Sequence, residues 1–222
     1  MITVHHLNNS RSQRILWLLE ELGLPYEVKR YQRDARTMLA PPELKAVHPL
    51  GKSPVIDDDG TVVAESGNII GYVVDRHGGG RLAPLAGTPQ RLRYNYWLHY
   101  AEGSAMTPLL LKLIFGRIGS APMPFFAKPV ARGIVAKVTG EFIDPQLKLH
   151  FDYIESELDR HAWFAGDAFS AADIQMSFPL EAASTRAASA VGRKSRAFLD
   201  RIHARPAYQA ALAKGGKYEL LG

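Results

Sequence analysis

The sequence contains no cysteine, and this absence excludes several kinds of site. Without thiols the chain forms neither disulfide bridges nor thiolate metal sites, and it lacks the simplest enzymatic nucleophile. The eight histidines do not replace them, because no His-x-x-x-His or His-Glu pair occurs. His5 and His6 are adjacent on a predicted strand and therefore face opposite sides. We expect no metal site.

Long apolar runs are also missing. No segment approaches the roughly 20 apolar residues that span a bilayer, and the N-terminus lacks the charged-then-apolar pattern of a signal peptide. We therefore expect no membrane partner, and the absence of cysteine favours a cytoplasmic protein. A hydrophobic content of 46% with 22% charged residues is typical of a globular protein, and 222 residues suffice for one large or two small domains.

The chain is basic, with a net charge of +5, but its basic residues are scattered. The densest group contains no aromatic side chains and comprises Arg186, Arg193, Lys194 and Arg196. Nucleic-acid-binding surfaces combine clustered charge with stacking side chains, so this group predicts a solvated face and no nucleic-acid partner. The net charge still favours small anionic ligands.

Strand and helix signals alternate over the first third of the chain. Residues 2–6 and 26–31 predict strands, and residues 54–64 predict a hairpin that turns at Asp-Asp-Gly. Two apolar stripes at helical spacing predict helices between and after them, at Ile15, Leu18, Leu19 and Leu22 and at Ile70, Val73, Val74 and His77. The order βαβ–ββα predicts a small mixed sheet with helices packed on it.

The composition changes near residue 78, where glycines and prolines predict a linker. Beyond it only helical patterns remain, at 90–115, 147–158, 171–186 and 193–204, with a short final helix after Pro206. The prolines and phenylalanines of 116–133 predict a helix break with an ordered loop. The fold class is therefore α/β plus all-α, with domains at 1–80 and 88–222.

Ser170-Ala171-Ala172-Asp173 predicts a capping box, in which the Ser170 hydroxyl accepts from a helix amide and Asp173 accepts from the cap amide. We interpret this motif as a folding device without chemistry.

A second polar corner lies beside the hairpin, where Ser53-Pro54-Val55 precedes it and Glu65-Ser66 follows it. A carboxylate and a hydroxyl at a positively polarised helix start suit a small ligand that carries both an ammonium and a carboxylate. An ordinary hairpin with Ser66 as a helix N-cap explains the same residues.

Together these motifs resemble the glutathione S-transferase superfamily, in particular its serine- and asparagine-type bacterial and fungal members. HPLGKSPV at 48–55 is similar to the segment with the family's cis proline, and AES at 64–66 to its γ-glutamyl motif. The box at 170–173 and RPAY at 205–208 also match. The resemblance covers essentially the whole chain, and it implies a thioredoxin-like N-terminal domain followed by a helical bundle.

The activity that this resemblance implies is transfer of glutathione, as co-substrate, to a hydrophobic alkyl or aryl electrophile in a homodimeric detoxification enzyme without metal. Ser53, through a cis bond to Pro54, would pair its backbone with the cysteinyl part of glutathione. Ser66 would bind the γ-glutamyl carboxylate and Glu65 the ammonium. Lys52 would pair with the glycyl carboxylate, although a solvated lysine fits equally.

The helical domain would supply the remaining contacts. Glu102 would reach the γ-glutamyl ammonium across a two-fold interface. The electrophile would lie against apolar side chains, for which the candidates are Leu111, Phe115, Phe125 and Phe126, although packing in the core explains any one of them better.

Thiol activation would fall to the loop between the first strand and the first helix. A free thiol has a pKa of about 8.5, so donors or positive charge must stabilise the thiolate. Ser10 aligns best with the catalytic serine of serine-type members, Asn9 falls where others carry cysteine, and Arg11 can act by charge. The loop has no tyrosine. Ser10 and Ser12 as plain helix caps remain the alternative.

Two other functions stay open. The first is glutathione-dependent reduction of peroxides or disulfides, in which glutathione would supply both sulfurs. The second is a non-catalytic binding protein on the same fold, against which the intact SPV and ES motifs argue.

Overall fold

The computed structural model describes residues 1–216, 218 and 219. Its N-terminal part is built on a four-stranded sheet with the order β2-β1-β3-β4. β1 and β2 are parallel, whereas β3 is antiparallel to both β1 and β4. The bounds are β1 (Ile2–Leu7), α1 (Ser12–Leu22), β2 (Tyr26–Tyr31), α2 (Glu43–Val47), β3 (Val55–Asp58), β4 (Thr61–Ala64) and α3 (Ser66–His77). The expected βαβ–ββα order is confirmed.

The hairpin between β3 and β4 turns at Asp59 and Gly60, with φ of 49° and 89°. Two successive residues with positive φ match the right-handed twist of the flanking strands, and for this reason an Asp-Gly pair is a strong hairpin signal. The Gly60 amide also donates to Asp57 Oδ1 at 2.7 Å, which closes the turn.

A short helix, α2, lies in the proline-containing segment for which the sequence predicted only irregular structure. Leu44 is fully buried there with Leu7 and Tyr31. One buried residue in a five-residue helix leaves no periodic signal, and tertiary contact decides the conformation.

The second part of the chain is helical. Its elements are α4 (Pro89–Tyr100), the π-helical turn η1 (Ala101–Ala105), α5 (Met106–Ser120), α6 (Lys128–Val138), the π-helical turn η2 (Thr139–Ile143), α7 (Asp144–Arg160), α8 (Ala171–Arg186), the 3₁₀ turn η3 (Ala188–Ala190), α9 (Arg193–His203) and α10 (Pro206–Gly215).

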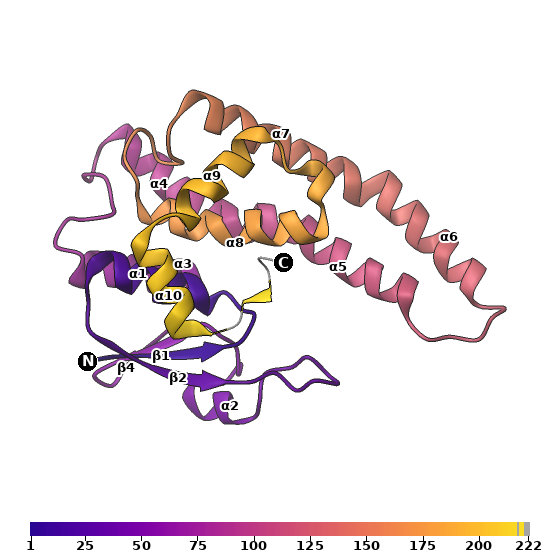
Figure 1. Cartoon of the computed structure of the whole chain (residues 1–222), viewed down its shortest axis with the longest axis horizontal. Helices are drawn as coiled ribbons and strands as arrows, with labels where there is room; N and C mark the ends of the chain where they lie inside the picture. The colour runs from indigo at the N-terminus through magenta and orange to yellow at the C-terminus, as the bar shows by residue number, and fades with distance from the viewer. Residues whose placement is uncertain (217, 220–222) are drawn as a thin grey trace.

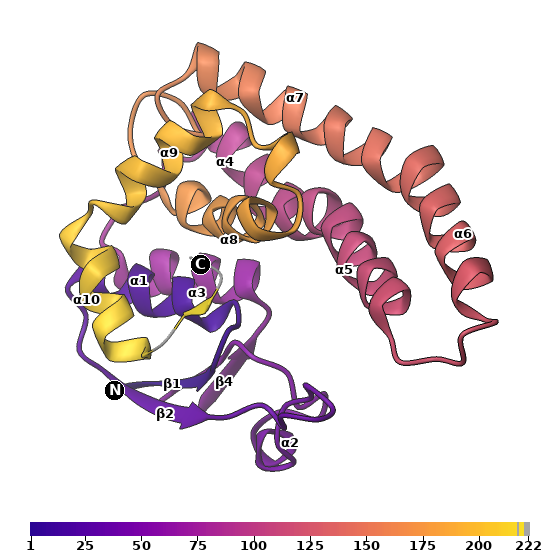
Figure 2. The ribbon, with the colours of Figure 1, turned by 45° about the vertical axis from the view of Figure 1, so that its right-hand side comes forward.

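Helices α1 and α3 lie between the sheet and α8 (Figures 1 and 2). The middle of α1 is therefore apolar all round: Ile15, Leu16, Trp17, Leu18 and Leu19 are each fully buried. α10 returns to pack along α1, where the rings of Trp17 and Tyr208 lie 5.1 Å apart. The division into domains of 1–80 and 88–222 stays a prediction, and α10 shows that the last helix contacts the first part of the fold.

The predicted break at 116–133 is real but shorter than expected. α5 continues to Ser120 and α6 begins at Lys128, so only residues 121–127 lie outside a helix. Pro129 lies in the first turn of α6, where a missing amide hydrogen breaks no helical bond, so this proline starts a helix instead of ending one.

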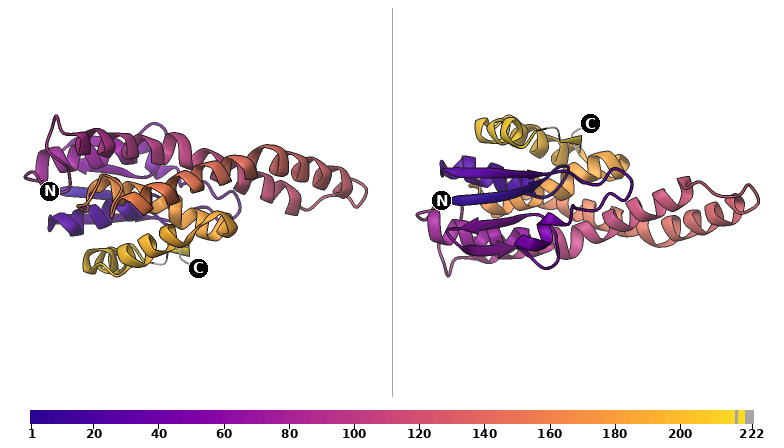
Figure 3. Two further views of the ribbon diagram at one scale, coloured as in Figure 1. Left: turned by 90° about the horizontal axis from the view of Figure 1, so that it is seen from above. Right: turned by 90° about the horizontal axis from the view of Figure 1, so that it is seen from below.

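Helices α5, α6 and α7 extend from the body as a long hairpin (Figure 3). Phe125 and Phe126 lie at its tip and are 84% and 70% exposed. Over the described ranges 1–216 and 218–219, no helix combines the length and the apolar character needed to cross a membrane.

Candidate functional site

Two adjoining pockets open between the sheet and the helical part. The sheet-side pocket, about 310 Å³, lies along the start of β3, the end of β4 and the start of α3. The helix-side pocket, about 470 Å³, lies between the loop after β1 and helices α5 and α8. Both are lined by Arg11, Lys52 and Ser53, so they form one groove that meets at these residues.

The structure brings all nine sequence-predicted site residues to this groove. Asn9 and Ser10 line the helix-side pocket, and Pro54, Glu65, Ser66 and Glu102 line the sheet-side pocket, while the three shared residues lie between them. Four separate chain segments therefore converge on one site.

The wall of the sheet-side pocket begins at the Ser53–Pro54 peptide bond, which is cis as expected. The Ser53 hydroxyl donates to the His5 backbone carbonyl at 2.9 Å and ties this loop to β1. Lys52 is exposed at the lip of the groove.

Ser66 is not the N-cap of α3, which the alternative of an ordinary hairpin followed by a serine cap had predicted. It is the first residue of the helix and is buried, while Glu65 occupies the cap position with φ of 70° and no side-chain cap bond. The exposed Glu65 carboxylate and the first amides of α3 therefore lie side by side at the pocket. A helix start of this kind attracts a carboxylate, and a neighbouring carboxylate attracts an ammonium.

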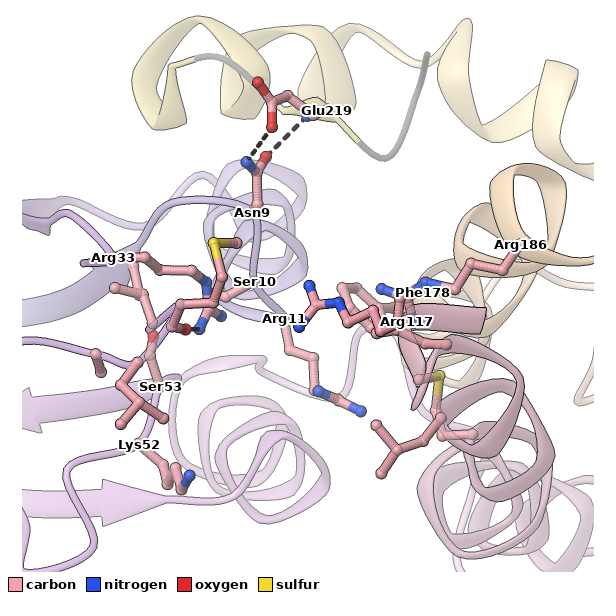
Figure 4. Close-up of a pocket in the computed structure, with 17 residues that line it drawn as sticks. Asn9, Ser10, Arg11, Arg33, Lys52, Ser53, Arg117, Phe178, Arg186 and Glu219 are labelled. Atoms are coloured by element: carbon pink, nitrogen blue, oxygen red, sulfur yellow. Dashed lines mark hydrogen bonds between the residues drawn. The ribbon is translucent and has the colours of Figure 1, made fainter. Parts of the chain in front are cut away.

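The loop after β1 places Asn9 against the C-terminal segment. Asn9 has φ of 49°; its Nδ2 donates to Glu219 Oε2 and its Oδ1 accepts from the Glu219 amide, both at 2.8 Å (Figure 4). This two-point contact uses one of the two N–H donors and the carbonyl oxygen of the Asn9 side-chain amide. It joins segments 210 residues apart.

Ser10 belongs to a buried hydrogen-bonded chain. Its Oγ accepts from the Ser12 amide at 3.2 Å and lies 2.7 Å from Ser12 Oγ, which in turn lies 2.9 Å from His6 Nδ1. Burial lowers the pKa of His6 to about 4, against a hydrogen bond to the Gly215 backbone, so the ring is neutral at pH 7. With its N–H directed to Gly215, His6 accepts from Ser12 at Nδ1, and Ser12 accepts from Ser10. Neither serine is the helix cap: Arg11 holds that position without a side-chain cap bond, and Ser10 accepts from the amide of Ser12, the first residue of α1.

Arg11 and Arg14 bind the same carboxylate. Arg11 Nε lies 2.8 Å from Glu102 Oε2, and Arg14 forms a second ion pair with Glu102 Oε1. The Arg14 side chain is only 2% exposed and also donates to the Gln175 carbonyl at 2.6 Å. Burial raises the pKa of Glu102, but the charges of Arg14 and Arg11 outweigh it and hold that pKa below its usual value.

Glu102 lines the sheet-side pocket of its own chain. Its expected action across a two-fold interface stays a prediction. The π-helical turn η1 packs against α8 and places Glu102 within reach of Arg14 on α1 and of Arg11 at the N-cap of that helix. π-turns are frequently found at functional sites.

The apolar side of the helix-side pocket is not the one expected. Met106, Leu110, Leu113 and Phe178 line it. None of the four expected apolar residues lines it within the described part of the chain: Phe125 and Phe126 lie at the tip of the hairpin, and Leu111 lines a separate pocket. A helix turns by 100° per residue, so the one-residue difference between Leu111 and Leu110 changes the face.

Residues 10–76 match the family model described as "Glutathione S-transferase, N-terminal domain", and residues 143–206 match "Glutathione S-transferase, C-terminal domain". A curated relative from Saccharomyces cerevisiae, "Glutathione S-transferase 1", is 38% identical over 193 residues, which is 84% of this chain and 82% of the relative. The chain belongs to the glutathione S-transferase family.

Solved glutathione S-transferase structures share this fold. One from Actinobacillus pleuropneumoniae is 35% identical, with a TM-score of 0.83 over 99% of this chain and 95% of that one. Another, a sphingomonad enzyme described as complexed with glutathione, is 25% identical, with a TM-score of 0.70 over 96% and 98% of the two chains. The expected thioredoxin-like domain followed by a helical domain is confirmed.

In this glutathione S-transferase family member, three basic residues of the site were not predicted from the sequence. Arg33, Arg117 and Arg186 line the helix-side pocket. Arg186 had been assigned to a solvated basic face, but it is half-buried at the end of α8. No local pattern marks these residues, because each comes from a different element. Over residues 1–216 and 218–219, no group of histidine, aspartate and glutamate side chains is arranged to hold a metal ion.

Proposed function

We propose that this protein is a glutathione transferase that binds glutathione in the sheet-side pocket and ionises its thiol where the two pockets meet. The thiolate attacks an electrophilic carbon in the helix-side pocket. The observation that carries this proposal is the convergence of the nine predicted residues on one groove. The sphingomonad relative described as complexed with glutathione supports it.

The binding roles follow from the charges along the groove. The Ser66 hydroxyl and the first amides of α3 bind the γ-glutamyl carboxylate, and Glu65 accepts from the ammonium. The Ser53 backbone pairs with the cysteinyl residue beside Pro54, and Lys52 pairs with the glycyl carboxylate. Glu102, which lines the same pocket, adds negative charge on the ammonium side.

Thiol activation belongs to the loop Asn9–Ser10–Arg11. The Ser10 hydroxyl donates to the sulfur only when its proton turns away from Ser12, and the Asn9 amide keeps one donor beyond its bond to Glu219. Arg11 lines both pockets and keeps its terminal guanidinium N–H groups beyond the Nε bonds to Glu102. We therefore assign the larger share of thiolate stabilisation to the charge of Arg11, with Ser10 and Asn9 shaping the loop around the sulfur.

Replacing Glu65 by Gln is expected to weaken glutathione binding about tenfold to a hundredfold, because the ammonium loses a charge-assisted acceptor worth about 1.5–3 kcal/mol. Isothermal titration calorimetry of the free protein with glutathione measures the dissociation constant. Asp75→Asn is the matched control, since it removes one negative charge from the exposed side of the same helix. Equal affinities for the Glu65→Gln variant and the wild type would contradict the assigned binding site.

Replacing Arg11 by Met is expected to raise the pKa of the bound thiol by about one unit, whereas Ser10→Ala and Asn9→Ala each raise it by much less. One unit corresponds to about 1.4 kcal/mol, the scale of one nearby charge in a partly exposed site. The thiolate absorbance of enzyme-bound glutathione, titrated with pH, gives the value. A larger shift in Ser10→Ala than in Arg11→Met would return the main role to the hydroxyl.

The function itself is tested by three measurements on the wild type. Binding of glutathione together with turnover of a chloronitrobenzene supports the transferase. Binding with turnover of cumene hydroperoxide alone would assign the protein to peroxide reduction, and absence of binding would leave a non-catalytic role. A cytoplasmic location and a role in detoxification accompany this proposal.

A homodimer also belongs to the proposal. Leu92 and Leu149 are 73% and 62% exposed on α4 and α7, and apolar side chains in such positions are stabilised by a partner surface. Sedimentation equilibrium gives the mass in solution, and a monomer at micromolar concentration would remove this part.

A further inference from the structure

The helix-side pocket carries more positive charge than a purely apolar acceptor requires. Among the described residues that line it, five are basic (Arg11, Arg33, Lys52, Arg117 and Arg186) and one, Glu219, is acidic. Arg33 follows β2, Arg117 lies on α5 and Arg186 ends α8, and Figure 4 shows Arg117 and Arg186 extending from the helical side into the pocket. The fold therefore collects charges from three distant elements at one cavity.

The charges of Arg33, Arg117 and Arg186 are not neutralised by ion pairs within the described part of the chain. Within residues 1–216 and 218–219, neither the Arg117 nor the Arg186 side chain has a hydrogen-bond or ion-pair partner, and the Arg33 side chain donates only to the backbone carbonyls of Asn8 and Met38. The carboxylate of Glu102 is held by Arg11 and Arg14, and Glu219 is engaged by Asn9. A salt-bridge network inside the protein thus does not explain why the cations gather here.

The cations also act on one another. Burial lowers the pKa of Arg186, and the charges of Arg11 and Arg117 lower it further; the same three causes act on Arg33. Like charges held together in a partly desolvated pocket raise the free energy of the empty site, and a bound anion relieves that repulsion.

The rest of the pocket suits the body of an organic molecule. Met106, Leu110, Leu113 and Phe178 form an apolar wall, and Arg11 Cζ lies 4.7 Å from the centre of the Phe178 ring. A planar apolar group can pack on this wall while a carboxylate on it faces the guanidinium groups, which bind carboxylates in a forked geometry.

We propose that the electrophilic acceptor of this enzyme is an organic anion, a carboxylate on an apolar or aromatic body, which Arg117 and Arg186 bind in the helix-side pocket. This inference rests on the proposed transferase function and specifies its substrate class. For a chloroarene acceptor, the thiolate sulfur forms a carbon–sulfur bond, the carbon–chlorine bond breaks, and chloride leaves with the electron pair. The thiol proton goes to solvent, so no oxidant or reductant is needed.

The test compares 4-chloro-3-nitrobenzoate with its methyl ester, which has the same reacting carbon but no charge. Each kcat/KM is divided by the second-order rate constant of that compound with free glutathione, which corrects for the different activation of the ring. We expect the corrected value for the acid to exceed that for the ester by at least tenfold, and the excess to shrink as salt is raised. An excess below twofold would overturn the inference.

Variants assign the effect to residues. Arg117→Met and Arg186→Met are each expected to lower the acid-to-ester ratio about fivefold to tenfold, since a charged hydrogen bond in a partly exposed site is lost. Arg132→Met, which removes an exposed arginine of α6 that lines none of the described pockets, is expected to leave the ratio unchanged. A ratio equally insensitive to all three changes would overturn the assignment.

Three results separate this inference from the function on which it rests. If neither compound is converted although both are reactive with free glutathione, the transferase proposal itself fails. If the ester is converted at least as well as the acid, the function stands and the anionic acceptor is wrong. If the variants raise the KM of glutathione and leave the ratio intact, the arginines bind a carboxylate of glutathione, and the inference is overturned as well.

Discussion

Replacing Asp173 by Ala is expected to lower the free energy of unfolding by about 3–5 kcal/mol. The carboxylate is fully buried and accepts three hydrogen bonds, from the Phe164 amide at 2.9 Å, the Ser170 amide at 2.8 Å and the Ser170 hydroxyl at 3.1 Å. Removing it leaves two amide groups without acceptors in a site that water does not reach, and each such group costs about 1–3 kcal/mol.

The effect extends beyond one helix end, because Asp173 holds the loop that positions Phe164. The Phe164 ring lies 4.6 Å from that of Trp97 and 5.0 Å from that of Phe198, so it joins α4 to α9. Loosening this loop therefore weakens the core of the helical part as well as the start of α8.

Urea unfolding followed by circular dichroism measures the change. Ser170→Ala is the control, since it keeps the carboxylate and loses only the capping hydroxyl, at about 1 kcal/mol. Asp173→Asn, which retains one acceptor oxygen, is expected to fall between the two. A loss below 1 kcal/mol in Asp173→Ala would show that the buried amides find other acceptors.

Replacing Glu102 by Gln is expected to lower the free energy of unfolding by about 2–4 kcal/mol, because Arg14 keeps its charge in a buried position without an anion. The Arg14 side chain is 2% exposed and that of Glu102 is 31% exposed, so part of the penalty is screened by water. The neutral amide of glutamine accepts from one guanidinium group but does not compensate two positive charges.

A double variant distinguishes the charge from the shape of this contact. Arg14→Met combined with Glu102→Leu removes both charges and is expected to recover most of the lost stability, since an apolar pair of similar volume often replaces a buried ion pair at little cost. Arg11→Met, which leaves the Arg14–Glu102 pair in place, is expected to cost less than 1 kcal/mol. If the double variant is as unstable as Glu102→Gln, the loss of stability comes from packing and not from the unpaired charge.

The same double variant probes glutathione binding. If Glu102 contributes negative charge on the ammonium side of the groove, the double variant regains stability without regaining affinity for glutathione. Calorimetric titration beside the unfolding experiment measures both quantities on one preparation. If the double variant regains both its stability and its affinity for glutathione, Glu102 has only a structural role.

Short sequence patterns predicted most of the helices and strands, because each of these elements is determined by residues within it or next to it. The stripe at Ile15, Leu18, Leu19 and Leu22 faces a core, the Asp59–Gly60 pair adopts the positive φ values of a tight hairpin, and the Ser170–Asp173 box forms its reciprocal bonds. The helix α2 and the start of α6 were missed for the same reason. A five-residue helix has too few positions for a period, and the prolines that break one helix also begin another.

The order of strands and helices and the chemistry of turns and caps follow from the sequence alone, since each depends on neighbours a few positions away. The candidate residues for glutathione follow from the resemblance of the motifs to the family. Other features of the site come from the packing of distant segments: Glu102 pairs with Arg11 and Arg14, Asn9 binds Glu219, and Arg117 and Arg186 share a pocket with Arg33. The Arg11–Glu102 contact joins residues 91 positions apart, and the Asn9–Glu219 contact joins residues 210 positions apart. The sequence around a charged residue does not indicate which distant side chain it will contact. The electrostatics of the site therefore depend on how the helical part packs on the sheet.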